Sequence, residues 1–296
     1  MTIGADTPLW LAARALLHLR LKEFFHCWQQ VLEGGEAEPI HDLRVASRRL
    51  REGLALFAPC YPASPLARVI RRVKGVTRLL GEMRNADEAL LYFGCLVERL
   101  GVPEAASLDT LITGLRKERD QGARHLTLAL ESLSIRVVRD NFRKTLGTPR
   151  LFSLPSEAVN PFSSIGSFAR QAIEERLSLV LDLVPEARDE AGIAVQHKLR
   201  IAIKHFRYRL EILSFPVTRG SQENIDVLKC YQDLLGRMHD RDVFAGLVRK
   251  AGFLPSAERI VLESIARERR ELHGEFLVLL KDKPLNGIGE RVRSAL

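Results

Sequence analysis

The chain has 296 residues, of which 46% are hydrophobic, so it can bury one large core or two ordinary ones. Lys and Arg number 45 against 37 acidic residues, and the net charge of +8 favours an anionic partner. No basic region precedes the apolar stretch near the N-terminus, and no window approaches about 18 uncharged apolar residues, so we expect neither a signal peptide nor a membrane span.

Apolar residues recur with helical spacing through the first half of the chain. Glycine and proline residues separate the segments, and Thr7 is a plausible N-cap for the first of them. Gly81 marks either a close helix contact or a short break in the third. The predicted helices of this half span Pro8–Leu32, a segment around His41–Phe57, Ser64–Leu100 and Leu108–Leu146.

A stretch rich in Pro, Ser and Gly, residues 147–166, carries no helical stripe and is predicted to be a linker. After it the same order recurs, with helices predicted over residues 167–183, 197–216, around 234–248 and 256–280. Amphipathic helices joined by short loops pack as bundles. We therefore predict an all-α protein of two four-helix bundles, residues 1–146 and 167–296, related by a pseudo-two-fold axis.

The two halves share a basic helical segment. Residues 41–57 read HDLRVASRRLREGLALF, and residues 197–213 read HKLRIAIKHFRYRLEIL. Both copies place a histidine and three cations within a sector of roughly 80° of the helix surface, apart from the apolar side. The paired positions, 156 residues apart, are His41 with His197, Arg44 with Arg200, Arg48 with Lys204, and Arg51 with Arg207.

The sign of the charges on this stripe decides its interpretation. A solvated helix face usually mixes signs, because opposite charges three or four residues apart attract. Here those positions carry only positive charge, and like charges about 6 Å apart repel by roughly 0.7 kcal/mol in water. Such a stripe costs stability unless an anion lies on it. The duplicated stripe therefore predicts a protein that binds a polyanion.

A second repeat follows each basic segment. Residues 79–87 read LLGEMRNAD and residues 234–242 read LLGRMHDRD, so Lys74 matches Lys229. Asp87 and Asp242 recur at the end of the motif, and we expect them to pair with Arg or to brace the fold rather than bind metal. Mixed charges surround Arg119 and Arg269, which favours solvated helix faces, although both arginines have the reach to enter a cavity.

These segments resemble the hallmarks of the CHAD domain, the conserved histidine α-helical domain. The family carries an HxLRVxxRRLR-like helix and an LGxxRDxDV-like helix once in each half. The first motif is present as His41–Arg51 and again as His197–Arg207, and the second as Leu80–Asp87 and again as Leu235–Asp242. The resemblance covers nearly the whole chain, because the motifs, their order and their duplication all agree.

The resemblance implies two four-helix bundles whose basic residues line a central cavity or groove that binds inorganic polyphosphate. It also implies association with polyphosphate granules, as in some members. The residues predicted to contact polyphosphate are His41, Arg44, Arg48, Arg49, Arg51, Arg71, Lys74, Arg78, Arg84, His197, Arg200, Lys204, Arg207, Lys229, Arg237 and His239.

The sequence departs from the family pattern in three places. Asn85 follows Arg84 where the motif has Asp, and His239 stands where the first copy has Arg84. Arg78 aligns with Asp233, so we expect one wall of the site to be more basic than the other.

Some CHAD domains are fused to a triphosphate tunnel domain with an ExExK motif. That motif is absent here, so its triphosphatase activity is not expected.

Other functions remain open at this stage. His41 and His197 suit a phosphotransfer protein, and the net charge permits nucleic-acid binding, although the sequence shows no helix-turn-helix, interleaved aromatic residues or basic tail. A third alternative is an interaction scaffold. We predict no catalytic residue, cofactor or metal site, and the oligomeric state is left open.

The cysteines carry the prediction of compartment. Cys27, Cys60, Cys95 and Cys230 form no CxxC pair and no metal-ligand spacing. They are expected to be reduced thiols, which indicates the cytoplasm.

Overall fold

The computed structural model describes residues 3–33, 37–151, 159–217 and 221–295. Within these ranges the chain is helical, apart from turns, connecting segments and one isolated β-bridge between Pro8 and Ser164. This confirms the all-α prediction. The helices are α1 (Leu9–Leu32), α2 (Ala37–Leu56), the 3-10 helix η1 (Ala58–Cys60), α3 (Ala63–Val97), α4 (Val102–Ser132), α5 (Ile135–Gly147), α6 (Ile165–Ala187), α7 (Ile193–Val217), α8 (Ser221–Lys250), α9 (Pro255–Asp282) and α10 (Leu285–Ala295).

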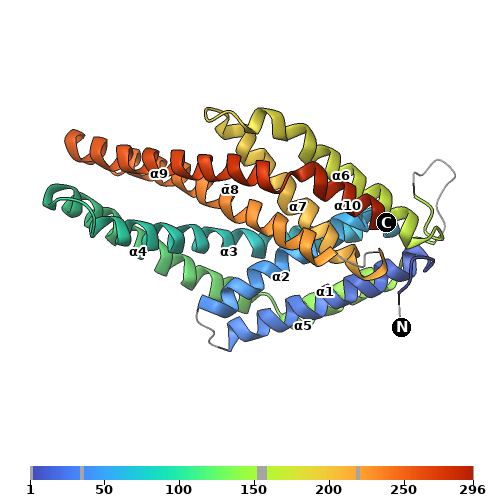
Figure 1. The fold of residues 1–296 in the computed structure, drawn as a ribbon. Coiled ribbons are helices and arrows are strands. Elements are labelled where there is room, and N and C mark those ends of the chain that lie inside the picture. Colours follow the sequence, from blue (N-terminus) through green and yellow to red (C-terminus); the bar gives the residue numbers. More distant parts are fainter. Residues whose placement is uncertain (1–2, 34–36, 152–158, 218–220, 296) are drawn as a thin grey trace.

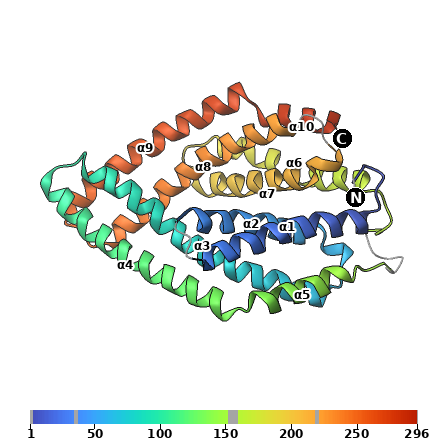
Figure 2. The same cartoon turned by 90° about the horizontal axis from the view of Figure 1, so that it is seen from below.

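The four long helices of each half pack against their neighbours in the chain, from α1 to α4 and from α6 to α9, and α2 of the first half contacts α7 of the second. The α3–α4 and α8–α9 pairs extend beyond the rest of the molecule, to the left in Figure 1, while both termini lie at the opposite end. Figure 2 shows these two distal hairpins converging at their tips. The α2–α7 contact therefore joins the two halves near the base of the hairpins.

Two hydrophobic clusters hold this arrangement together. The larger cluster contains residues of both halves, including Leu50 on α2 and Leu210 on α7. The smaller one joins the distal hairpins, where the rings of Tyr92 and Phe244 stack with centroids 4.7 Å apart. The larger apolar core thus contains residues from both sides of the predicted linker. The domain boundaries at residues 146 and 167 stay a prediction about folding units.

The starts of α1 and α6 pair through their backbones in a reciprocal way. The N–H of Leu9 donates to the carbonyl of Ser163 at 2.8 Å, and the N–H of Ile165 donates to the carbonyl of Thr7 at 2.9 Å. Thr7 and Ser163 are 156 residues apart, as are Leu9 and Ile165, and this is the spacing of the basic repeat. A local two-fold axis between the two helix starts produces this pattern, which supports the predicted pseudo-symmetry.

Among the described residues, each half has a short α-helix after its four long ones. The helix expected over residues 108–146 ends at Ser132, because Leu133 is extended and the hydroxyl of Ser134 accepts a hydrogen bond from the N–H of Val137 at 3.4 Å to begin α5. The second half adds α10 after Pro284. The sequence prediction did not include either break.

Two local expectations about caps and glycines were wrong. The N-cap of α1 is Pro8, and the hydroxyl of Thr7 instead accepts a hydrogen bond from the N–H of Gly4 at 2.9 Å. Helix α3 runs through Gly81 without a break, and a Cβ there would meet no atom within 4 Å. Neither residue therefore has the role that its type suggested.

Candidate anion-binding site

Helices α2 and α7 present their cations because their other sides are buried. Leu43 and Leu50 on α2 and Leu199 and Ile203 on α7 have no exposed surface. The basic residues of the stripe stay out of this core, apart from Arg44, which is buried, since burying an isolated charge is costly. The two stripes therefore border the space where α2, α3, α6 and α7 meet, which is the location of the candidate site.

Cations from three helices lie close enough to disfavour one another. Burial, together with neighbouring Arg48 and Arg200, lowers the pKa of Lys204 to about 7. Burial, Arg48 and Arg84 lower the pKa of Arg44 to about 9, still high enough for it to be charged at neutral pH. Positive charge is therefore concentrated where α2 and α7 meet α3.

Carboxylates compensate this charge only in part. Arg84 forms an ion pair with Glu88, and Asp240 lies near enough to Arg200 to favour its charged form. Arg48 and Lys204 form no ion pair with any residue that the structure describes. The middle of the stripe thus carries cations without a carboxylate partner of their own.

A cavity of about 540 Å³ opens beside these residues, within the size range of ligand sites in proteins. It carries six Lys and Arg side chains and a single carboxylate, and its lining comes from four helices. The residues are Arg48, Arg51, Glu52 and Ala55 from α2, Ile70, Lys74, Thr77 and Arg78 from α3, Arg176 from α6, and Lys204, His205 and Tyr208 from α7.

The one carboxylate in the lining is already engaged. Glu52 is 3% exposed and accepts hydrogen bonds from Arg209 Nε at 2.9 Å and from His205 Nδ1 at 2.6 Å. Burial opposes its ionisation, but the hydrogen bonds from His205 and Arg209 outweigh burial and lower the pKa of Glu52. The carboxylate therefore stays charged and bound to α7, and the remaining cations face the cavity.

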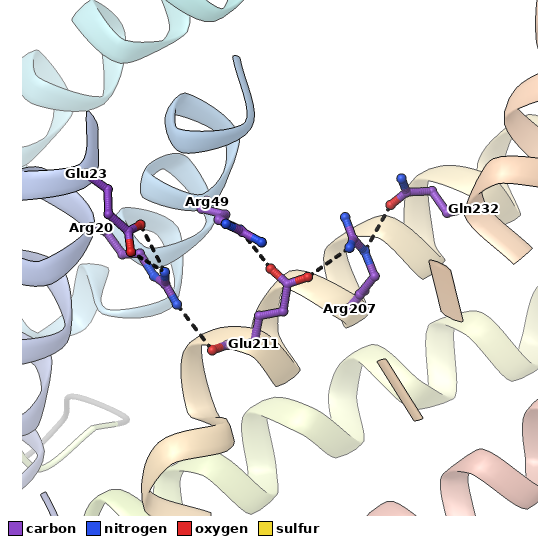
Figure 3. A network of polar contacts seen from close by, with 6 residues as sticks. All are labelled: Arg20, Glu23, Arg49, Arg207, Glu211 and Gln232. Carbon is purple, nitrogen blue, oxygen red and sulfur yellow. Dashed lines mark hydrogen bonds and ion pairs between the residues drawn. The ribbon is translucent and has the colours of Figure 1, made fainter. Parts of the chain in front are cut away.

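A second part of the α2–α7 contact is organised differently. Figure 3 shows Arg49 and Arg207 converging on the carboxylate of Glu211, each at 2.9 Å. Arg207 also donates to Gln232 at 3.2 Å, and Arg20 donates to the backbone carbonyl of Glu211 at 3.3 Å. Arginines in this part of the contact are thus held by an internal carboxylate.

The histidine motif residues do not lie in equivalent surroundings. His197 and His239 contact each other through their Nδ1 atoms at 3.1 Å, so one ring donates and the other accepts. Burial, Arg200 and His197 lower the pKa of His239 to about 4, which keeps it neutral at physiological pH. His41 is more exposed, and its partial burial, together with Arg44 and Arg84, lowers its pKa.

The chemistry that this arrangement offers is charge-assisted hydrogen bonding to an anion, with Arg supplying planar forks and Lys a mobile point charge. Across the described residues, no group of three or more His, Cys, Asp and Glu side chains is placed to hold a metal ion. None of the described helices is both long and apolar enough to cross a membrane.

Basic residues also line two hollows against α5. One, of about 470 Å³, includes Arg72 and Lys144, and the other, of about 450 Å³, includes Lys22 and Arg139. Positive charge is therefore not confined to the α2–α7 cavity. A test of function must change the cavity residues themselves.

The CHAD domain family model matches residues 15–249, which is most of the chain. This chain belongs to the CHAD domain family. The crystal structure of the CHAD domain from the plant Ricinus communis is similar to this CHAD chain, with a TM-score of 0.63 and 24% identity over 100% of this chain and 95% of that one. PptA from Streptomyces chartreusis is similar with a TM-score of 0.70 and 18% identity, over 93% and 98% of the two chains.

At these identities the likeness to solved structures is one of fold, and no curated protein matches the chain. The family predicted from two short motifs is confirmed by the match over residues 15–249. The binding residues carried over from the family stay a prediction, and the structure shows where each of them lies.

The predicted CHAD residues fall into three groups. Five line the cavity, namely Arg48, Arg51, Lys74, Arg78 and Lys204. A second group does not line the cavity but lies near its cations or in the contact between the two histidine rings. It consists of His41, Arg44, Arg84, His197, Arg200 and His239. The third group lies elsewhere, namely Arg49, Arg71, Arg207, Lys229 and Arg237.

The third group has identifiable reasons for its position. Arg49 and Arg207 are paired with Glu211, and Arg237 with Glu275 at 2.6 Å. Arg71 and Lys229 are exposed and line none of the cavities described above. The predicted stripe is therefore divided between two parts of the α2–α7 contact.

The cavity also contains residues that were not predicted. Arg176 enters it from α6 and His205 and Tyr208 from α7. The sequence repeat could have pointed to Arg176, because an arginine, Arg20, lies at the matching position 156 residues earlier.

The recurring aspartates behave as predicted. Asp87 pairs with Arg119 at 3.1 Å and Asp242 with Arg269 at 2.7 Å. They brace the third helix of each half against the fourth, and both arginines are held there.

Proposed function

We propose that this CHAD domain binds inorganic polyphosphate, without catalysing a reaction, in the cavity between α2, α3, α6 and α7. The observation that carries the proposal is the convergence of six Lys and Arg side chains from these four helices on one cavity. Arg48 and Lys204, at matching positions of the repeat, form no ion pair among the described residues and are its central cations.

The chemistry of the ligand fits this lining. Polyphosphate carries about one negative charge for each internal phosphate and has no bases, so a receptor needs cations at fixed positions and little else. Arg51 and Lys74 extend the positive surface onto α2 and α3. Rigid helices hold these side chains before the ligand arrives, which lowers the entropic cost of binding. The link of the family to polyphosphate supports this choice of anion.

Titration with long-chain polyphosphate at low and moderate salt tests the proposal, with charge-matched duplex DNA and RNA as competitors. We expect submicromolar affinity that falls steeply with salt, because binding releases counterions. We also expect that nucleic acid does not displace the bound polyphosphate. Ready displacement by DNA or RNA would contradict the proposal and assign the cavity to nucleic acid.

The absence of catalysis is a separate part of the proposal. After incubation with the protein and a divalent metal ion, polyphosphate should keep its chain length and release no phosphate. Shortened polyphosphate chains would contradict it and favour hydrolysis. A phosphoryl group found on His41 or His197 would contradict it and favour phosphotransfer.

A cytoplasmic location on polyphosphate granules is the cellular form of the same proposal. A fluorescent fusion should co-localise with the granules and lose that location when the cavity cations are reversed. A diffuse signal from the unaltered fusion would contradict granule association alone.

A further inference from the structure

The network around Glu211, which includes Arg20, Arg49, Arg207 and Gln232, matches one part of the cavity lining in the other half. A shift of 156 residues relates α2 to α7 and α1 to α6, and a shift of 155 relates α3 to α8. These shifts match four residues that line the cavity with four residues drawn in Figure 3. The pairs are Arg51 with Arg207, Thr77 with Gln232, Arg176 with Arg20, and His205 with Arg49.

One substitution separates the two sides. Ala55 lines the open cavity, and its counterpart is Glu211. The Glu211 side chain is only 11% exposed, and its two oxygens accept from Arg49 of α2 and Arg207 of α7. Where one side has space bordered by cations, the other has a carboxylate between cations.

The carboxylate of Glu211 makes the contacts that an anionic ligand would make. Two guanidinium groups from different helices approach its two oxygens at 2.9 Å, the distance of charge-assisted hydrogen bonds to carboxylate or phosphate. Without it, Arg49 and Arg207 would face each other across the helix contact with no internal anion between them. Such a pair attracts an anion from solution.

We propose that the side of Arg49 and Arg207 is a second anion site, held closed by the carboxylate of Glu211, which confines polyphosphate to the open cavity. The inference deepens the proposed function and rests on it for the class of ligand. Glu211 is then a specificity-determining residue, because its carboxylate decides whether an external anion binds only in the open cavity or also between Arg49 and Arg207.

Calorimetric titration with tripolyphosphate measures the number of sites on the full chain. We expect one site in the unaltered protein and two in Glu211→Ala. Glu211→Gln should show a second but weaker site, because the amide no longer neutralises the arginines although it still fills most of the space. Glu263→Ala is the matched control, since it removes one carboxylate from an exposed ion pair with Arg259 and should leave one site.

The reciprocal variant keeps the test independent of the stability of Glu211→Ala. Ala55→Glu places a carboxylate four residues after Arg51, as Glu211 follows Arg207, and should weaken tripolyphosphate binding by about tenfold or more. The combined variant Ala55→Glu with Glu211→Ala should retain one site, which Arg207→Gln then removes.

The outcomes separate the two proposals. Folded Glu211→Ala and Glu211→Gln variants that bind a single tripolyphosphate, with unchanged affinity, would overturn the closed second site. An unaltered protein that binds no polyphosphate, together with a Glu211→Ala variant that does, would overturn the proposed function and leave the closed site standing. Failure of both proteins to bind would overturn both.

Discussion

The charge of Lys204 depends on what the cavity holds. Burial, Arg48 and Arg200 lower its pKa to about 7, so the ligand-free side chain is mostly neutral above that pH. A bound polyanion opposes the repulsion and raises the pKa again. Because the unfolded chain keeps this proton up to the ordinary value of 10.5, ligand-free stability should rise as the pH increases above 7.

Polyphosphate binding at about pH 8 should therefore take up close to one proton at Lys204, because the side chain is neutral before binding and charged after it. Calorimetry in two buffers of different ionisation enthalpy measures the uptake. Lys204→Met should lose most of it, and the same uptake in that variant would show that another group takes the proton.

Charge reversal at Arg48 and Lys204 tests the middle of the stripe. Arg48→Glu with Lys204→Glu should lower polyphosphate affinity by about a hundredfold or more at low salt, since two charge-assisted contacts are lost. Ligand-free stability should stay unchanged or rise, because like charges no longer face one another.

Arg116→Glu with Lys117→Glu is the matched control, since it makes the same change in net charge on an exposed part of α4. Calorimetry and thermal melting measure the two effects. Retained affinity in the folded cavity variant would refute the assignment, and a large drop in melting temperature would make the stripe structural.

Among the helices, α2 and α7 are joined by the buried carboxylate of Glu52. Glu52 binds Arg209, whose guanidinium also donates to the carbonyl of Ala172 on α6 at 2.9 Å. Three helices of the cavity therefore meet at one ion pair. Arg209 is 9% exposed, so it has little access to water if its partner is removed.

Glu52→Ala should lower the free energy of unfolding at neutral pH by up to about 3–5 kcal/mol, since it leaves the buried Arg209 with only the more distant carboxylate of Glu175, at 3.8 Å. Urea denaturation measures the change. The exposed pair variant Glu263→Ala should cost less than about 1 kcal/mol. Because the folded-state pKa of Glu52 is lowered, its contribution is present above an ordinary pKa of 4.5 and is lost as the pH falls through the folded value. If the unaltered protein and Glu52→Ala still differed in free energy of unfolding at acidic pH, the ionised carboxylate would not be the cause of the difference.

The whole molecule joins two halves of similar design through one continuous core. The larger hydrophobic cluster includes Leu50 and Leu54 of the first half and Leu210 and Leu213 of the second. The backbones at the starts of α1 and α6 also bond to each other. Separation at the linker would expose apolar surface that the other half now covers.

Residues 1–146 and residues 167–296, produced separately, should each lack a cooperative unfolding transition. The reason is that each loses the apolar partner surface across the α2–α7 contact. Circular dichroism during heating measures this, with the full chain as the control. A sharp transition in either fragment alone would show that the halves are independent domains.

Local patterns were enough to predict the helical class, the order of the repeated helices and the family. Each of these depends on residues close together in the chain or on a spacing that repeats. The same patterns predicted that Asp87 and Asp242 pair with Arg or brace the fold. The uneven site expected from Arg78 and Asp233 stays a prediction, and of these two residues Arg78 lines the cavity. The patterns missed the break before α5, which depends on one extended residue and a serine cap.

The sequence by itself determined which face of each helix is basic, because helical periodicity places a residue around its own axis. Only the tertiary structure decided which basic faces meet. Arg51 and Arg207 occupy matching positions, yet the first lines a cavity while the second binds Glu211 together with Arg49 from another helix. Glu211 stands where the first half has Ala55, but the approach of Arg49 to this carboxylate follows from how α2 packs on α7, and helix packing is set by contacts between residues far apart in the chain.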